Sequence, residues 1–225
     1  MQDLATIFAG LHRHHTATPR EPLPPPEPGV TWIWAGNGVW KRGVSSTLDL
    51  LICVHRIETP GLAALQPHAR WRTHDGRIPG ELLEGVFDHA RRAGAPGRGG
   101  VLSLVEQQYF ITWQDGADRP FQVEVPPQEA TATSVRYELA TSGVVLVDLH
   151  SHGALEAFFS SMDNDDDGGW LSVSAVIGNV VERPGIAVRL NVYGHHQRVR
   201  ALDVFTTLPD DVRDTYNRRQ SHASA

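Results

Sequence analysis

The sequence predicts an α+β fold in which a β-rich segment precedes a helix and a larger set of strands. Three observations carry this prediction. Most of the chain consists of short apolar runs separated by turns rich in Gly, Pro and Asn. One amphipathic helix interrupts these runs at residues 79–92. Residues 144–149 are apolar on both strand faces except for Asp148, which is typical of a strand in the middle of a sheet.

The composition excludes several classes of protein. The 225 residues suffice for one large domain or two small ones, and the formal net charge of −6 argues against a nucleic-acid-binding protein with a basic face. No apolar run approaches the roughly 20 residues of a membrane span, and the N-terminus lacks a secretory apolar region. Cys53 is the single cysteine, so a disulfide framework and a multi-cysteine zinc site are excluded. We expect a cytoplasmic protein that binds neither nucleic acid nor membrane.

Residues 1–28 are predicted to form a short helix and a proline-rich linker. Apolar residues at helical spacing favour a helix over residues 1–18. Six prolines in residues 19–29 exclude helix and sheet and favour an extended spacer. We therefore place a domain boundary at residue 28.

Residues 29–78 are predicted to form a β-rich module. The dipeptide Asn37-Gly38 joins two β-type runs and is a strong hairpin signal. A further strand is expected in the apolar run at residues 48–57, where Cys53 is interpreted as a small buried hydrophobe. Trp32, Trp34 and Trp40 are interpreted as an aromatic packing cluster.

Residues 79–207 are predicted to form the main domain, with a polar tail at 208–225. After the helix at 79–92, strands are expected at 101–116, 121–125 and 134–140, and then at 144–149. Three more strands, at 170–181, 186–194 and 199–205, have short connections that favour an antiparallel meander. The expected turn at 195–198 exposes His195 and His196. The tail is predicted to form a short helix.

The residues that carry chemistry follow the apolar strand. His150 and His152 stand two positions apart, so that both point to one face of a strand. Asp163 follows within fourteen positions of His150. Two imidazoles and one carboxylate provide the three protein ligands of a catalytic zinc site and leave one coordination position open.

The pattern His150-x-His152, seven residues, Ser160, two residues, Asp163 resembles the signature of the JAMM (JAB/MPN-type) zinc metallopeptidases. Within that family, the His-Ser-His-Gly sequence, the Ala-Phe-Phe-Ser run and the aspartate cluster resemble the PRTRC-system A proteins. The resemblance implies a cytidine-deaminase-like MPN/JAB fold with a mixed central sheet flanked by helices, plus a small β-rich N-terminal segment. It is strongest over residues 79–206. The sequence departs from the family at Gly153, where proline is usual, and in the two glycines after the aspartates.

The resemblance also implies roles for individual residues. His150, His152 and Asp163 would bind Zn²⁺, and Ser160 would stabilise the oxyanion. Ser160-x-x-Asp163 also fits a helix capping box, and the two roles are compatible. The family has a catalytic glutamate upstream, at the start of a strand, and Glu106 fits that place 44 residues before His150. Asp148 is a candidate for fixing a histidine tautomer. The rival candidates for the catalytic glutamate are Glu81, Glu84, Glu124 and Glu129.

The sequence excludes two other kinds of metal site. Asp163-x-Asp165-x-Asp167 matches the first half of an EF-hand loop, but the twelfth position is Ser174 instead of glutamate. A zinc deaminase would need a Pro-Cys-x-x-Cys sequence, which is absent from the chain. Residues 165–167 are therefore interpreted as solvated acids. His74 and His89 are single and indicate no site.

The resemblance implies hydrolysis of a peptide or isopeptide bond through a metal-activated water. The expected partner is a protein or peptide substrate, with a ubiquitin-like protein among the candidates, and a ThiF-like activating enzyme is a candidate partner. The alternative is a non-catalytic MPN-type binding or scaffold module in a plasmid or phage maintenance system. A purely structural metal fits an open three-ligand site less well.

Overall fold

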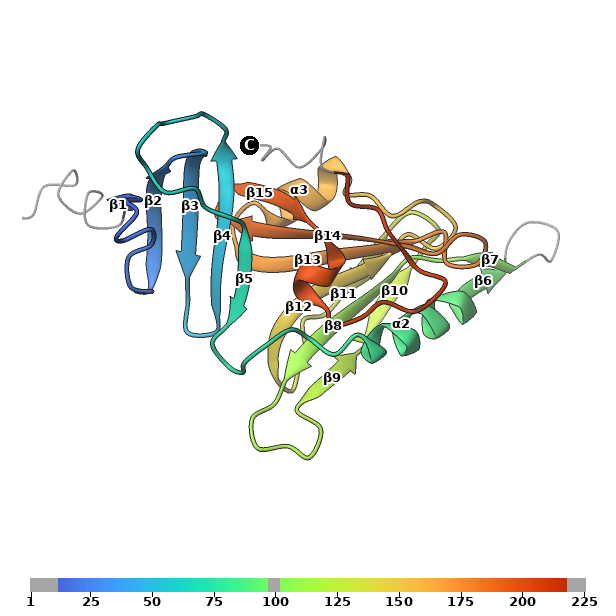
Figure 1. Ribbon diagram of the computed structural model, residues 1–225. Helices are drawn as coiled ribbons and strands as arrows, with labels where there is room; N and C mark the ends of the chain where they lie inside the picture. Colours follow the sequence, from blue (N-terminus) through green and yellow to red (C-terminus); the bar gives the residue numbers. More distant parts are fainter. Residues whose placement is uncertain (1–11, 97–101, 218–225) are drawn as a thin grey trace, which may run out of the picture.

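The computed structural model describes residues 12–96 and 102–217, and it has the sheet-rich α+β architecture that the sequence predicts (Figure 1). Among the described residues, no helix is long and apolar enough to cross a membrane. The helices are α2 (Glu81–Arg92), α3 (Ser161–Asp167) and α4 (Ala201–Val204). The strands are β1 (His12–Thr16), β2 (Gly29–Ala35), β3 (Gly38–Val44), β4 (Leu48–His55), β5 (His68–Trp71), β6 (Gly94–Pro96), β7 (Leu102–Leu104), β8 (Gln107–Trp113), β9 (Phe121–Glu124), β10 (Gln128–Ala130), β11 (Val135–Tyr137), β12 (Val144–Ser151), β13 (Leu171–Gly178), β14 (Gly185–Val192), β15 (His195–Val199) and β16 (Arg213–Asp214).

Two large sheets organise the molecule. The first has the order β1-β2-β3-β4-β5, and the second has the order β15-β14-β13-β12-β8-β9 with β16 beside β14. In the second sheet β12 pairs with β13 in parallel and with β8 antiparallel, so the sheet is mixed. Strands β13, β14 and β15 form the antiparallel meander that was predicted. Strand β12 lies inside the sheet, which confirms the prediction from its apolar sequence.

One continuous core joins α2, the inner face of the first sheet and one face of the second sheet. Leu83, Val86 and Phe87 of α2 are buried in it, together with Leu50 and Ile52 of β4. Burying one such side chain stabilises the fold by about 1.5–3 kcal/mol. Residues 29–78 therefore share this core with the rest of the chain. The domain boundary at residue 78 stays a prediction. The opposite face of the second sheet carries the polar residues described below, together with buried apolar ones such as Val176 and Ala187.

The N-terminal segment differs from its prediction in two ways. Residues 12–16 form strand β1, paired in parallel with β2, instead of helix; residues 1–11 of the predicted helix lie outside the described residues. Pairing with the edge of the hairpin outweighs the local helical spacing. The proline-rich segment has no helix or strand, as expected, but it is packed on the protein instead of free. The Arg42 guanidinium donates to the Pro24 carbonyl at 2.6 Å, and Leu23 packs on the outer core of the first sheet.

The hairpin predicted at Asn37-Gly38 is confirmed. The predicted packing cluster of three tryptophans is wrong. Gly38 has φ +149°, and the Asn37 side chain bridges to the backbone of Leu65. Trp40 is paired with Ile33, so its side chain lies on the face of the sheet opposite to Trp32 and Trp34. Trp40 is buried while Trp34 is 48 % exposed. The burial of the single cysteine, Cys53, is confirmed.

The C-terminal elements also correct the sequence prediction. His195–Val199, where a turn was expected, is strand β15. The turn lies directly before it, at Tyr193 and Gly194, which have φ values of +40° and +84°. The predicted strand at 199–205 is mostly helix α4. Residues 208–217 contain no helix; Val212 is buried in the core and β16 pairs with β14. Tertiary packing has overridden local signals in each case.

Candidate metal centre

Strand β12 places the first two candidate ligands. Its alternation directs Val147 and Leu149 into the core and leaves Asp148 and His150 on the opposite face. His152 follows the end of the strand, and its backbone N–H donates to the Ile177 carbonyl at 2.8 Å. The chain therefore stays extended past His150, so the two imidazoles lie beside one another.

Helix α3 supplies the third candidate ligand through a capping box. The Ser160 hydroxyl oxygen accepts from the Asp163 N–H at 3.2 Å, and the Asp163 Oδ2 accepts from the Ser160 N–H at 2.6 Å. This confirms the capping box predicted from the spacing. With Oδ2 occupied, Oδ1 of Asp163 is left facing His150.

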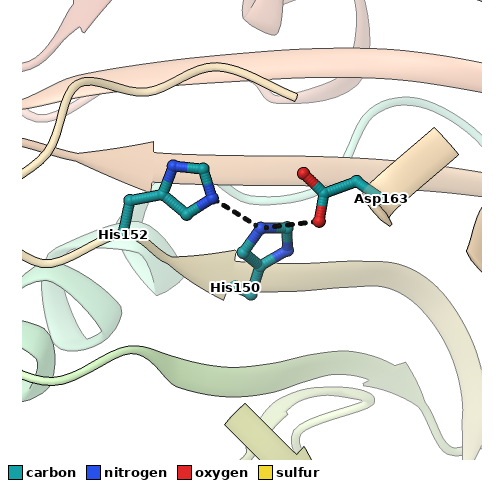
Figure 2. Close-up of side chains that lie close together, drawn as sticks. All are labelled: His150, His152 and Asp163. Atoms are coloured by element: carbon teal, nitrogen blue, oxygen red, sulfur yellow. Dashed lines mark hydrogen bonds and ion pairs between the residues drawn. The ribbon is translucent and has the colours of Figure 1, made fainter. Parts of the chain in front are cut away.

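The three side chains converge on one point, as Figure 2 shows. The Nε2 atoms of His150 and His152 are 3.1 Å apart, and Nε2 of His150 is 3.3 Å from Oδ1 of Asp163. Their ligand atoms all lie within 4.8 Å of one another. Tetrahedral Zn²⁺ with bonds of about 2.0–2.1 Å separates its ligand atoms by about 3.4 Å. The residues present therefore fit a zinc ion.

The protonation of the two histidines is also suited to metal binding. Burial lowers the pKa of His150 to about 4, although the neighbouring Asp163 carboxylate opposes this shift. Burial likewise lowers the pKa of His152. Nδ1 of His152 is 3.3 Å from the Glu156 carbonyl oxygen, so a proton on Nδ1 leaves the Nε2 lone pair for a metal. Both imidazoles are neutral near pH 7, the state that coordination requires.

Glu106 enters the same site from the segment between β7 and β8. Its backbone N–H donates to the Thr131 carbonyl at 2.7 Å. Its side chain lines a cavity of about 370 Å³ together with His150, His152 and Asp163. Burial, and then the negative charge of Asp163, raises the pKa of Glu106 to about 7. A carboxylate with such a pKa can both accept and return a proton at neutral pH.

The four rival glutamates lie outside the cavity. Glu81 and Glu84 are exposed on the first turn of α2, where they favour the helix dipole. Glu124 accepts hydrogen bonds from Thr112 and Ser142, and Glu129 is exposed on β10. Of these five glutamates, Glu106 is the one that lines the cavity.

Apolar side chains form part of the cavity lining. Tyr137 comes from β11, and Leu155, Phe158 and Met162 come from the loop after His152 and from α3. These four side chains are between 40 % and 68 % exposed. Ser160 also lines the cavity. The arrangement offers apolar contacts next to the candidate metal position.

Residues 80–191 match the family model for prokaryotic homologs of the JAB domain. This match supports a relationship to the JAB/MPN family. The match runs from α2 to β14, so it includes Glu106, His150, His152, Ser160 and Asp163. The JAB family includes both metalloisopeptidases and non-catalytic members. The comparison with curated proteins finds no match.

The local backbone accounts for the glycine after the second histidine. Gly153 has φ +56°, which proline cannot adopt. Its N–H also donates to the Ser151 hydroxyl at 3.0 Å, a bond that proline would lose. A Cβ at this position would lie 3.1 Å from Leu104. The departure from the usual proline therefore reflects a different local backbone.

Several polar residues near the site behave differently from their predictions. Asp167 is not a solvated acid, because its Oδ2 accepts from Ser174 at 2.7 Å and from Arg189. His195 and His196 lie on β15 and are only partly exposed, because the turn is displaced toward Gly194. The Asp148 carboxylate accepts from the Gln108 amide at 2.6 Å, and its effect on a histidine tautomer stays a prediction.

Arg189 is the residue near the site that sequence reasoning missed. It is fully buried on β14 and contacts α3. The available signal was a lone arginine inside the apolar run IAVRLNV, because a charged residue in a buried strand needs a partner.

The raised pKa of Glu106 predicts a pH-dependent cost in the metal-free protein. An acid whose folded pKa lies above its unfolded value loses stability as pH rises from about 4.5 through 7. Between pH 5 and pH 8 the free energy of unfolding of Glu106→Gln should therefore rise by about 1–2 kcal/mol relative to that of the wild type, after allowance for partial exposure. Urea unfolding in a chelator measures the difference. The exposed control Glu84→Gln should show no such change, and parallel pH profiles for Glu106→Gln and wild type would contradict the assignment.

Proposed function

We propose that this chain is a zinc-dependent metallopeptidase or isopeptidase of the JAMM type. The observation that carries the proposal is the convergence of His150, His152, Asp163 and Glu106 on one cavity. Three ligands with room for a fourth fit a catalytic metal better than a structural one. The JAB-domain match supports the same assignment.

The proposed reaction adds water across an amide bond. A bound Zn²⁺ supplies Lewis acidity, lowering the pKa of a water to about 7 and polarising the scissile carbonyl. Glu106 accepts a proton from the attacking water while the oxygen of that water bonds to the carbonyl carbon. Glu106 then gives that proton to the amine nitrogen as the C–N bond breaks.

Ser160 and the two histidines have defined parts in the proposed reaction. The Ser160 oxygen accepts from the Asp163 N–H, so its own hydroxyl hydrogen is available to a developing oxyanion. His150 and His152 would hold the ion through Nε2, with Asp163 as the third ligand. The half-buried capping box holds Ser160 and Asp163 in fixed positions relative to one another, as both roles require.

We propose a protein or peptide chain as the substrate, with an extended segment lying between β11 and the loop after His152. The exposed Tyr137, Leu155 and Phe158 provide apolar contacts for it. A ubiquitin-like protein joined to a target fits this description, and a ThiF-like activating enzyme would then supply the conjugate. The resemblance to the PRTRC-system A proteins supports a place in a plasmid or phage maintenance system.

The test is metal-dependent hydrolysis. Zinc-loaded protein should cleave members of a quenched fluorescent peptide library that includes isopeptide-linked peptides. Cleavage should stop in 1,10-phenanthroline and return when zinc is restored. His55→Ala, which removes an exposed imidazole outside the site, should behave as wild type. Cleavage that survives chelation contradicts a metal mechanism, and binding without cleavage by zinc-loaded protein favours the scaffold alternative.

A further inference from the structure

We propose that Arg189 is a positioning residue of the candidate metal centre. Its guanidinium holds helix α3 on the sheet so that Asp163 faces His150. The inference rests on the proposed function, since it concerns the same three ligands. It adds a residue that the family signature and the capping box do not contain.

Helix α3 cannot maintain its position through its own sequence. It has seven residues, SMDNDDD, and isolated helices of this length are unstable in water. Its aspartates continue to the C-terminal end, where negative charge opposes the helix dipole, and its last turn has no basic residue. Met162, on the first turn, is 68 % exposed. The capping box fixes only the start of the helix, so the rest needs a partner on the sheet.

Arg189 is that partner. It lies in the middle of β14 with no exposed surface. Nη2 donates to the Asp163 carbonyl at 2.6 Å and to Oδ2 of Asp167 at 2.6 Å. Nε donates to the same Asp167 oxygen at 3.1 Å, and Nη1 donates to Oδ1 of Asn164. One guanidinium therefore contacts both the first and the last turn of α3.

Two further contacts fix the guanidinium itself. The ring of Phe159 lies with its centroid 4.0 Å from the guanidinium carbon. Ser174 donates to Asp167, and Asn191 donates to Ser174, so Asp167 is held from the sheet as well. A buried arginine with this many partners has little freedom to change rotamer.

The sheet register connects Arg189 to the histidine ligands. Arg189 pairs with Ser174 of β13, and Ser174 pairs with Asp148 of β12, two residues before His150. Arg189 thus lies on the same sheet face as His150, two strands away. Because it binds the carbonyl of Asp163, the position of that ligand is set relative to β12. The Ser160 N–H orients the carboxylate, and Arg189 fixes the backbone that carries it.

Lysine should not replace this arginine. Arginine offers a planar fork that reaches several acceptors at once, whereas lysine is a point charge with one nitrogen. In Arg189→Lys the charge balance with Asp167 is retained, but the fork to Asp163, Asn164 and Asp167 is lost. Loss of a residue that orients a metal ligand typically lowers metal affinity by about 10- to 100-fold. We expect a loss of that size for Arg189→Lys.

The experiment measures affinity for Zn²⁺ by competition with a chromophoric chelator, and coordination from the visible spectrum of the Co²⁺-loaded protein. Arg198→Lys is the matched control, because Arg198 is the register partner of Arg189 on β15 and bonds to Thr215 instead of α3. It should keep wild-type affinity and the wild-type Co²⁺ spectrum. Arg189→Lys should weaken binding and alter that spectrum.

A second variant separates positioning from folding. Arg189→Met combined with Asp167→Asn removes both charges, so no carboxylate is left facing the sheet unpaired. This variant should fold and still show the weakened affinity, because the bond to the Asp163 carbonyl is gone. Wild-type affinity for Zn²⁺ in either folded variant would overturn the role of Arg189 but leave the proposed function intact. A wild-type protein that binds neither ion would overturn the proposed function and, with it, the inference.

Discussion

Glu106→Gln is expected to keep the bound zinc and to lower the rate of hydrolysis by about 10²–10⁴-fold, the usual contribution of a general acid–base group. The amide has nearly the shape of the carboxylate but cannot accept the proton of the attacking water. Glu106 lines the cavity without belonging to the three-ligand cluster, so metal content should not change. Single-turnover cleavage and zinc content, measured on the same preparation, test both halves of the prediction.

Glu84→Gln is the matched control for this experiment. This substitution makes the same chemical change at an exposed position on the first turn of α2. The rate of hydrolysis and the zinc content should therefore both stay at wild-type values. A Glu106→Gln variant with full activity would remove Glu106 from the mechanism. A variant that loses zinc would instead place Glu106 among the ligands.

His150→Ala and His152→Ala are each expected to weaken zinc binding by about 10²–10⁴-fold. Zinc sites bind with roughly 10–16 kcal/mol in total, so removing one of three protein ligands should cost about 3–5 kcal/mol. Hydrolysis should fall with occupancy, and excess zinc should restore only part of it. Titration against a competing chelator measures the affinity of each variant.

His55→Ala again serves as the control, because His55 is exposed at the end of β4. Its affinity for zinc should equal that of the wild type. If His150→Ala bound zinc as tightly as His55→Ala does, His150 would not be a ligand. If only one of the two histidine variants lost affinity, the ion would be held by a different set of residues.

The convergence of the candidate ligands could be predicted from the sequence because these residues are close together in the chain. His150, His152, Ser160 and Asp163 lie within fourteen positions, and strand alternation and capping-box spacing determine how such neighbours point. Glu106 comes from 44 residues upstream, and its place in the cavity depends on the antiparallel pairing of β8 with β12. Only the family resemblance could suggest it from sequence.

Other features could not be predicted because non-local packing decides them. Residues 12–16 become a strand since the edge of β2 is available, and the proline-rich segment packs since Arg42 donates to Pro24. Strand β15 begins at His195 because the turn needs the positive φ of Gly194. The hydrogen bonds from Arg189 to α3 join residues that are 22–26 positions apart in the sequence, and no periodic pattern in the sequence predicts them.

The central claim, that His150, His152 and Asp163 form a zinc site, is tested most directly by metal content. The protein should be purified without an affinity tag and analysed by inductively coupled plasma mass spectrometry beside His150→Ala and His55→Ala. We predict stoichiometric zinc in the wild type and in His55→Ala, and its loss in His150→Ala. Sub-stoichiometric zinc that is the same in all three proteins would contradict the account.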